Sequence, residues 1–278
     1  MTTLTQPPLS PQPVVPRPRA AAGPLTPARR VTFVVGALIS LVTIAYGVTA
    51  IVAEGSQAVE RLAFTIEPTG ATFTVQTDTG DITVRPSDDD RVHVVRTASF
   101  GGRRPAFVEQ PNGSGDRLVA NCGAHWFMSD CSVDYEVAVP DGMSLQLRTD
   151  TGDVLANGVD GALDAASSTG DVEVRGVAGP LMLHSSTGDV NADAVRSDSV
   201  DVSSSTGDVT VRFADEPNAV SATSNTGDVS LYLPDGPYAL TTDSDTGDVV
   251  LDVPSDPDSA RTVLARTDTG DVELRPAG

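Results

Sequence analysis

Acidic residues at a regular spacing are the part of this sequence with the clearest chemical potential. The tripeptide Thr-Gly-Asp, followed by Val or Ile, occurs eight times. Its aspartates are Asp81, Asp153, Asp171, Asp189, Asp208, Asp228, Asp248 and Asp271. If the repeats stack about 5 Å apart, neighbouring carboxylates repel by about 1 kcal/mol in water, and Ca²⁺ bound between them would remove that repulsion. The eight aspartates are therefore candidate calcium ligands.

The alternative role of these aspartates is structural. In a tight turn, the glycine supplies a positive φ and the aspartate accepts hydrogen bonds from nearby backbone N–H groups or threonine hydroxyls. The calcium-binding repeat Gly-Gly-x-Gly-x-Asp, which would supply more ligands, is absent from the chain. We therefore expect a turn function first, no cofactor, and Ca²⁺ binding only as the weaker alternative.

Four of the repeats also contain Asp-Thr-Gly, which is the catalytic turn of aspartic proteases. Their first residues are Asp78, Asp150, Asp245 and Asp268. Such proteases need two carboxylates that share one proton, and a tandem repeat does not build one facing pair. His184 stands next to Ser185, but neighbouring strand residues point to opposite faces, so these two cannot form a catalytic dyad. We therefore predict no catalytic residue.

The two cysteines, Cys122 and Cys131, enclose a short loop. Outside the cytoplasm, we expect them to form a disulfide that closes this loop. The alternative is a metal site with His125, but Cys, Cys and one His give only three ligands. Trp126 and Phe127 in the same loop either form a contact surface or cover one end of the fold, and the second is commoner for apolar side chains.

The positions around the repeated glycine predict the elements that carry these residues. Counted from the glycine, positions −7, −5, +2 and +4 are mostly apolar, and position −3 is always Ser or Thr. This alternation is typical of a strand on each side of a turn. After the second repeat, the glycines follow at spacings of 18, 18, 19, 20, 20 and 23 residues. Since a two-strand unit buries its apolar face only by stacking, we predict an all-β, parallel β-solenoid with 18–20-residue rungs; an antiparallel β-sandwich is the alternative.

The start of the chain predicts a membrane anchor. Residues 1–30 contain eight Pro, four Arg and no acidic residue, so we expect a disordered cytoplasmic tail. Residues 31–53 carry no charge and would rise about 34 Å as a helix, which is enough to cross a membrane. Arg29 and Arg30 precede this segment, so the positive-inside rule places the C-terminal part outside the cytoplasm. A cleaved signal peptide is the alternative, although its apolar region is usually shorter.

The rest of the chain divides into two predicted parts. We expect residues 54–150 to form a juxtamembrane and N-terminal β part that includes the disulfide loop and caps the solenoid, and residues 151–278 to form the solenoid itself. We expect the last rung to end at Leu274, Arg275 and Pro276, near an exposed edge of the solenoid. A charge and a proline there would discourage pairing between sheet edges.

The repeated Ser/Thr-x-Thr-Gly-Asp-Val unit, together with Tyr-Glu-Val-Ala-Val-Pro-Asp-Gly at 135–142, resembles the bacterial β-strand-repeat family labelled "putative adhesin". The resemblance covers roughly residues 65–278, and the single N-terminal span and the actinobacterial-looking use of Arg without Lys are similar too. It implies a role in surface adhesion or in the response to envelope stress. It supplies no catalytic residue.

Charge narrows the class of partner. The net charge is −20, and the 14 Arg and 38 acidic residues outside the tail give −24. A nucleic-acid partner is therefore not expected, because phosphate binding needs basic patches. We predict a non-enzymatic, single-pass membrane protein in adhesion, envelope scaffolding or envelope-stress sensing, with an envelope polymer or a protein as partner. The alternative is a carbohydrate-active enzyme, a polysaccharide lyase or hydrolase, in which Arg and carboxylates would converge in one groove.

Overall fold

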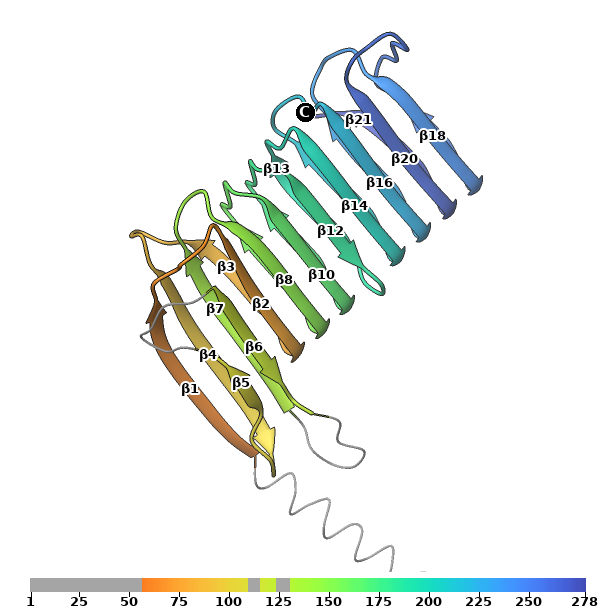
Figure 1. The fold of residues 1–278 in the computed structure, drawn as a ribbon. Helices are drawn as coiled ribbons and strands as arrows, with labels where there is room; N and C mark the ends of the chain where they lie inside the picture. Colours follow the sequence, from red (N-terminus) through yellow and green to blue (C-terminus); the bar gives the residue numbers. More distant parts are fainter. Residues whose placement is uncertain (1–56, 110–115, 124–130) are drawn as a thin grey trace, which may run out of the picture. The chain divides into compact units, whose positions relative to one another are not determined.

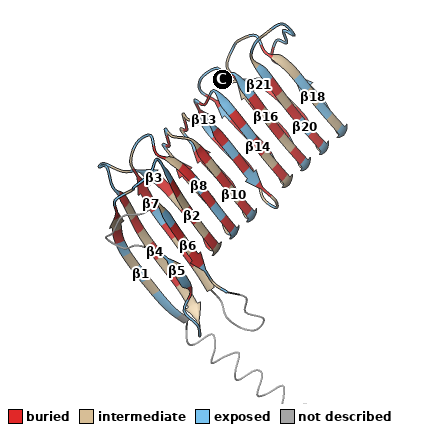
Figure 2. Cartoon of the chain, in the orientation of Figure 1, coloured by how far each residue is buried: buried red, intermediate tan, exposed pale blue. Residues whose placement is uncertain are grey.

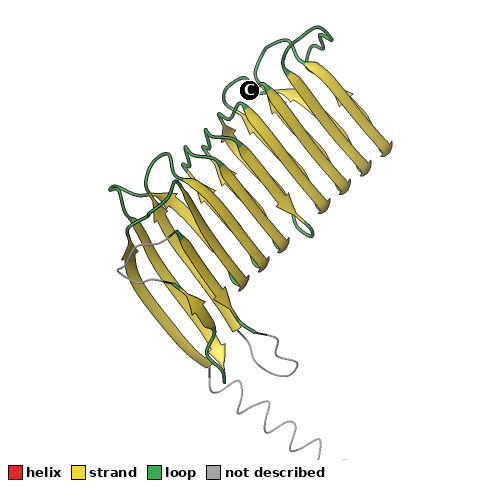
Figure 3. Cartoon of the chain, viewed as in Figure 1, coloured by secondary structure: helices red, strands yellow, loops and turns green. Residues whose placement is uncertain are grey.

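The computed structural model describes residues 57–109, 116–123 and 131–278, which form strands joined by turns and loops (Figures 1 and 3). No helix among these residues is long and apolar enough to cross a membrane. The predicted tail, 1–30, and the predicted transmembrane helix, 31–53, lie outside the described residues. The described strands form one sheet of eleven strands and one of ten.

The two sheets contain the following strands in spatial order. The eleven-stranded sheet consists of β1 (Gln57–Ile66), β4 (Val92–Gly101), β7 (Cys131–Val139), β3 (Ile82–Pro86), β9 (Val154–Asn157), β11 (Val172–Arg175), β13 (Val190–Val195), β15 (Val209–Phe213), β17 (Val229–Leu233), β21 (Val272–Pro276) and β19 (Val249–Leu251). The ten-stranded sheet consists of β18 (Ala239–Thr246), β20 (Thr262–Thr269), β16 (Ala219–Thr226), β14 (Ser199–Thr206), β12 (Leu181–Ser185), β10 (Leu163–Thr169), β8 (Ser144–Thr151), β2 (Thr72–Thr79), β6 (Arg117–Asn121) and β5 (Ala106–Val108).

Each Thr-Gly-Asp turn joins a strand of the ten-stranded sheet to a strand of the eleven-stranded sheet, so one repeat makes one rung. Neighbouring rungs pair in parallel at equivalent positions; Leu163 pairs with Leu181, for example. Among the described strands, antiparallel pairing occurs only where β1, β4 or β5 takes part. The predicted all-β fold with parallel strands is therefore confirmed, and the antiparallel sandwich is not.

The space between the sheets is filled by the positions that the alignment predicts to point inward. Val172, Val174 and Ala165 are fully buried in their rung, and Figure 2 shows the same buried bands recurring from strand to strand. The one polar inward column, position −3, is satisfied by the neighbouring rung: the Ser167 hydroxyl donates to the Gly152 carbonyl at 2.8 Å. The core is thus a stack of thin, closely similar layers.

The turn glycine is required by two separate constraints. Gly170 has a φ of +139°, and a Cβ atom there would lie 2.2 Å from the carbonyl oxygen of Gly152 in the preceding rung. Neither the backbone conformation nor the spacing between rungs admits a side chain. The same close approach recurs at the other turns of the ladder, so the repeated glycine sets how tightly the rungs stack.

The first repeat forms a rung of the same solenoid although it is distant in sequence from the others. Its strands β2 and β3 pair in parallel with β8 and β9, with Phe73 opposite Leu145 and Ile82 opposite Val154. The intervening chain forms β4 to β7. Of these, β4 pairs antiparallel with both β7 and β1, which ends the eleven-stranded sheet.

The last two rungs do not stack in chain order, which corrects the expectation for the C-terminal end. Strands β20 and β21 pair with β16 and β17 on one side and with β18 and β19 on the other. The final repeat therefore lies between its two predecessors, and Arg275 and Pro276 are not at the outer edge. The longer connection between β19 and β20, residues 252–261, lets the chain return by one rung. Because the rungs share the same inward columns, the final repeat can pair in register with both of its predecessors.

Candidate functional site

The eight repeat aspartates form a hydrogen-bonded ladder along the edge where the turns lie. The Asp153 Oδ1 atom accepts the backbone N–H of Asp171 at 2.8 Å, and the Asp171 Oδ1 atom accepts that of Asp189 at 2.8 Å. The same contact links the remaining turns, and Asp134 on β7 starts the series by accepting the N–H of Asp81 at 3.1 Å. Within the described part of the chain, no group of three or more His, Cys, Asp or Glu side chains is arranged to hold a metal ion.

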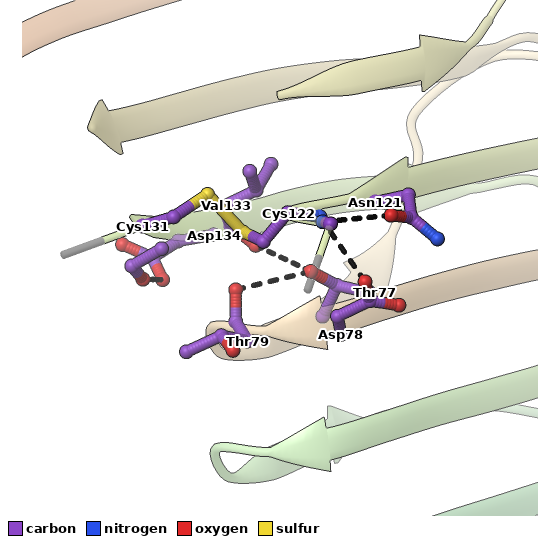
Figure 4. The surroundings of a disulfide bond; sticks show 10 residues. Thr77, Asp78, Thr79, Asn121, Cys122, Cys131, Val133 and Asp134 are labelled. Carbon is purple, nitrogen blue, oxygen red and sulfur yellow. Dashed lines mark hydrogen bonds between the residues drawn. A yellow bond between two sulfur atoms is a disulfide. The ribbon is translucent and has the colours of Figure 1, made fainter. Parts of the chain in front are cut away.

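A disulfide joins Cys122, the residue after β6, to Cys131 at the start of β7, with 5.8 Å between the Cα atoms (Figure 4). The bond connects the ten-stranded sheet to the eleven-stranded sheet. The backbone N–H of Cys122 donates to Asp78 Oδ2 at 3.1 Å, so one Asp-Thr-Gly aspartate supports this corner. With both sulfurs in the disulfide, no thiolate remains to bind a metal together with His125, and His125 itself lies outside the described residues.

The other catalytic motifs considered from the sequence do not assemble. The Ser185 side chain is fully buried and donates to the Gly170 carbonyl at 2.9 Å, whereas His184 points outward and lies 3.0 Å from the Ser203 hydroxyl. The Asp-Thr-Gly aspartates lie one to a rung. Their four rungs fall into two pairs, because β2 pairs with β8 and β18 pairs with β20. Within the described part of the chain, these aspartates do not face one another across two lobes.

A shallow hollow with a volume of about 440 Å³ lies on the outer face of the eleven-stranded sheet, across β11, β13 and β15. Its polar side chains come from three neighbouring rungs and are Glu173, Arg175, Asn191, Asp193 and Arg212. The side chains of Val174 and Ala192 point into the core, so the backbone forms the floor. The hollow combines guanidinium and amide donors with carboxylate and amide acceptors, which suits a ligand rich in hydroxyl groups.

A β-bulge in β13 shapes this hollow. The pairing of β13 with β15 shifts between Ala192 and Val195, so that two residues, Asp193 and Ala194, stand against Arg212 alone. Ala194 has a φ of +51°, and it is the one described non-glycine residue with a positive φ. A bulge of this kind bends the strand locally and redirects its side chains.

Neighbouring residues hold the two arginines of the hollow differently. Arg175 forms an ion pair with Glu173 on the same strand. Arg212 forms no ion pair with any described residue; its guanidinium carbon lies 4.6 Å from the ring centre of Tyr232, its register partner on β17. A cation–π contact orients the guanidinium without neutralising it. Arg212 therefore keeps its charge and donors for a ligand.

The hollow belongs to a longer column on this sheet, five positions after each repeat glycine. Four of the eight residues in this column are arginines, and all four are exposed: Arg85, Arg175, Arg212 and Arg275. The sequence pattern of the inward positions did not predict this outward column. The signal was present, because the fifth position concentrates Arg in an otherwise acidic chain.

A second polar cluster is enclosed between the sheets near the N-terminal end and was also missed. The Arg96 side chain is 2% exposed and donates to Glu109 at 2.5 Å and to Glu60 at 2.8 Å, while its guanidinium carbon lies 3.7 Å from the Phe107 ring centre. The Tyr135 hydroxyl donates to Glu109 at 2.7 Å, and burial, reinforced by this contact, raises the pKa of the phenol. A hydrogen bond from Arg104 lowers the pKa of Glu60. The cluster connects β1, β4, β5 and β7.

Part of the chain is similar to a known protein family. Residues 144–275 match the family described as Toastrack DUF4097. The match spans the rungs from β8 to β21 and does not include the first rung, β2 and β3. DUF4097 is a domain of unknown function. No curated protein matches the chain.

Two crystal structures show a distant likeness. A "putative cell adhesion protein" from Clostridium sporogenes aligns with 79% of this chain and 100% of its own, at 8% identity and a TM-score of 0.36. A "putative adhesin" from Bacteroides fragilis aligns with 77% of this chain and 97% of its own, at 12% identity and a TM-score of 0.40. Likeness at this level carries no argument about function.

Proposed function

We propose that this protein is a non-enzymatic, membrane-anchored binding protein outside the cytoplasm, and that its solenoid binds a polysaccharide of the cell envelope through the outer face of the eleven-stranded sheet. The observation that carries the proposal is the recurrence of arginine in one exposed column, with the hollow of Glu173, Arg175, Asn191, Asp193 and Arg212 at its middle. Such a role fits adhesion, envelope scaffolding or envelope sensing.

The geometry of the column favours a polymer over a small molecule. Small-molecule sites are usually deep and largely apolar, whereas this hollow is shallow and polar. Parallel strands lie about 4.8 Å apart, so the column offers polar groups at a fixed spacing along several rungs. Modest contacts that repeat along one ligand add up through effective concentration. A chain of sugar units lying across the strands would meet several of them at once.

The binding test uses the purified full-length chain and insoluble envelope polysaccharide in a co-sedimentation assay. Arg212→Gln removes one unpaired guanidinium, and we expect it to weaken binding about tenfold, since a hydrogen bond to a charged group contributes about 1.5 kcal/mol. Arg148→Gln on the ten-stranded sheet is the matched control and should leave binding unchanged, because Arg148 lies on the opposite face. Equal binding by both variants and the wild type would exclude the column as the site.

The carbohydrate-active enzyme remains a second candidate because the hollow brings two carboxylates, Glu173 and Asp193, close to two arginines. The same incubation tests it through the release of soluble sugar. Under the binding proposal, no sugar is released. Release that Glu173→Gln or Asp193→Asn abolishes, while binding persists, would establish catalysis instead.

The membrane anchor is proposed from residues 31–53 and from Arg29 and Arg30 before them. Protease added to intact spheroplasts should digest residues 54–278 and spare the N-terminal tail. Antibodies against each end would follow the two fragments. Protection of residues 54–278 until the membrane is opened would place the domain in the cytoplasm.

A further inference from the structure

The outermost rung of the solenoid, formed by β18 and β19, has a neighbour on one side only. β18 pairs with β20, and β19 pairs with β21. Val249 and Leu251 are 42% and 46% exposed, whereas Val272 and Leu274, at the equivalent positions of the next rung, are fully buried. Figure 2 shows the difference in the other sheet, where β18 lacks the buried bands that cross β20 and β16. The inward columns are therefore open to solvent at this end.

The turn of the outer rung also leaves two acceptors open. In the rung before it, Asp271 Oδ1 accepts the N–H of Asp248 at 2.8 Å, and the Gly270 carbonyl accepts the Ser244 hydroxyl at 2.9 Å. The corresponding atoms of the outer rung, Asp248 Oδ1 and the Gly247 carbonyl oxygen, accept no such bond from any described residue. A further strand-turn-strand unit would complete both contacts.

Charge on the outer rung selects the kind of unit that fits. Between positions 239 and 253 the chain carries four aspartates and no basic residue: Asp243, Asp245, Asp248 and Asp252. A second copy paired edge to edge would bring these charges together, which disfavours self-association. On the paired side, β20 places Arg266 opposite Asp243, with 3.9 Å between Arg266 Nε and Asp243 Oδ2. A strand on the open side would match best with a cation at the same position.

The geometry points to the outer rung as a docking site for an extended segment of another protein, which adds to the solenoid as a further pair of strands. The segment carries apolar residues at alternate positions, to cover Leu240, Val249 and Leu251, and a basic residue opposite Asp243. Backbone hydrogen bonds along an open sheet edge supply affinity in this mode of recognition, and alternate side chains supply specificity. β18 and β19 contain no Pro, which would remove a backbone N–H from an exposed edge. This edge lies one strand beyond Arg275, the last arginine of the column proposed to bind polysaccharide.

The chain supplies well-matched peptide probes. A peptide of residues 262–276 contains Arg266, whereas a peptide of residues 219–233 has Thr223 at the equivalent position, with nearly the same inward residues. Each peptide has a formal net charge of −1, from two Arg and three acids in the first and one Asp in the second. Fluorescence anisotropy of each labelled peptide with the full-length protein should show that the Arg266 peptide binds about threefold more tightly, as expected for one exposed ion pair.

Two protein variants localise the binding. Val249→Lys with Leu251→Lys should weaken binding of both peptides at least tenfold, whereas Met182→Lys should not, although Met182 is 53% exposed on the outer face of the ten-stranded sheet. Asp243→Lys should remove the preference for the Arg266 peptide, and Asp201→Lys on β14 should retain it. Circular dichroism confirms that each variant is folded.

Three results would overturn the proposal. The first is that neither peptide binds. The second is that the peptides bind the Val249→Lys, Leu251→Lys variant as tightly as they bind the wild type. The third is that the protein forms a concentration-dependent dimer, which this variant abolishes. The last result, measured by sedimentation, would assign the edge to a second copy of the chain. None of these outcomes depends on polysaccharide binding, so this inference and the proposed function stand or fall separately.

Discussion

At the scale of single residues, Ala194 shows how a local departure from the repeat creates a surface feature. In the two preceding rungs the same position, just before an inward valine, is held by Gly158 and Gly176, both with a φ of +64°. Ala194 takes nearly the same conformation at +51°, although its Cβ atom makes that region unfavourable. The three rungs of β9, β11 and β13 thus share this extra residue, and the register shifts only where β13 meets β15, which places Asp193 beside Arg212 in the hollow.

Replacement of Ala194 by glycine should therefore stabilise the protein. Glycine relieves the strain of a positive φ, worth about 1–2 kcal/mol, but gains freedom in the unfolded chain worth about 0.4–1 kcal/mol, so we expect a net increase of about 0.5 kcal/mol in the free energy of unfolding. Urea denaturation measures the difference. Ala192→Gly, two residues earlier, is the control: Ala192 is buried in the core, so the loss of its methyl group should lower stability by more than 1 kcal/mol. A loss of stability in Ala194→Gly would contradict the assigned backbone conformation.

At the scale of one rung, the aspartate ladder makes separate predictions for shape and for charge. The Asp189 Oδ1 atom accepts the N–H of Asp208 at 2.8 Å, and an asparagine could accept the same bond without the charge. We expect Asp189→Asn to be as stable as the wild type or more so, because it removes repulsion from Asp171 and Asp208. Asp189→Ala loses the bond and should lower the free energy of unfolding by about 1 kcal/mol. If thermal denaturation shows that both variants lose the same amount of stability, the negative charge of Asp189 itself would stabilise the fold, as it would if the ladder held a cation.

The rung is also the scale at which sequence-based prediction succeeds and then stops. Inward columns, the hydroxyl at position −3 and the turn glycine follow from the alignment, since each has one physical role that recurs in every repeat. The exchange of the last two rungs does not follow, because Val263 and Leu240 fill the same column and either can stand next to Val220. Only the connection at 252–261, which is longer than those between the rungs from β8 to β19, indicated that the chain could return by one rung.

The hollow escaped prediction for a different physical reason. Arg175, Asn191 and Arg212 are far apart in sequence and come together only because the rungs stack. Outward positions vary because packing in the core does not constrain them. A pattern among these positions can therefore be recognised only when the register of the strands is known. Arg96 is the opposite case: it occupies an inward position between Val94 and Ala98, and its partner Glu109 lies on a separate strand connection.

At the scale of the whole molecule, acidic and basic side chains lie on different surfaces of the solenoid. The turn edge carries a row of aspartates, the outer rung carries four more acids than bases, and the arginine column lies on the face of the eleven-stranded sheet. The two proposed partners use this separation. A hydroxyl-rich polymer meets the arginine column, and a strand with a basic residue meets the outer rung. Binding of the strand should weaken as salt is raised, because exposed charges are screened within about 8–10 Å at physiological ionic strength.

The same charge distribution governs how ions affect the stability of the chain. With a net charge of −20 and a continuous row of carboxylates, self-repulsion opposes the folded state, so the thermal midpoint should rise by a few degrees when NaCl increases from about 0.05 M to about 0.5 M. If the ladder is structural, as its backbone hydrogen bonds favour, about 1 mM CaCl₂ should raise the midpoint no more than MgCl₂ at equal ionic strength. The Asp189→Asn variant should respond to both salts as the wild type does. A rise specific to Ca²⁺, lost in that variant, would instead show that calcium neutralises the ladder, because only a cation held between neighbouring rungs would depend on one carboxylate in the row.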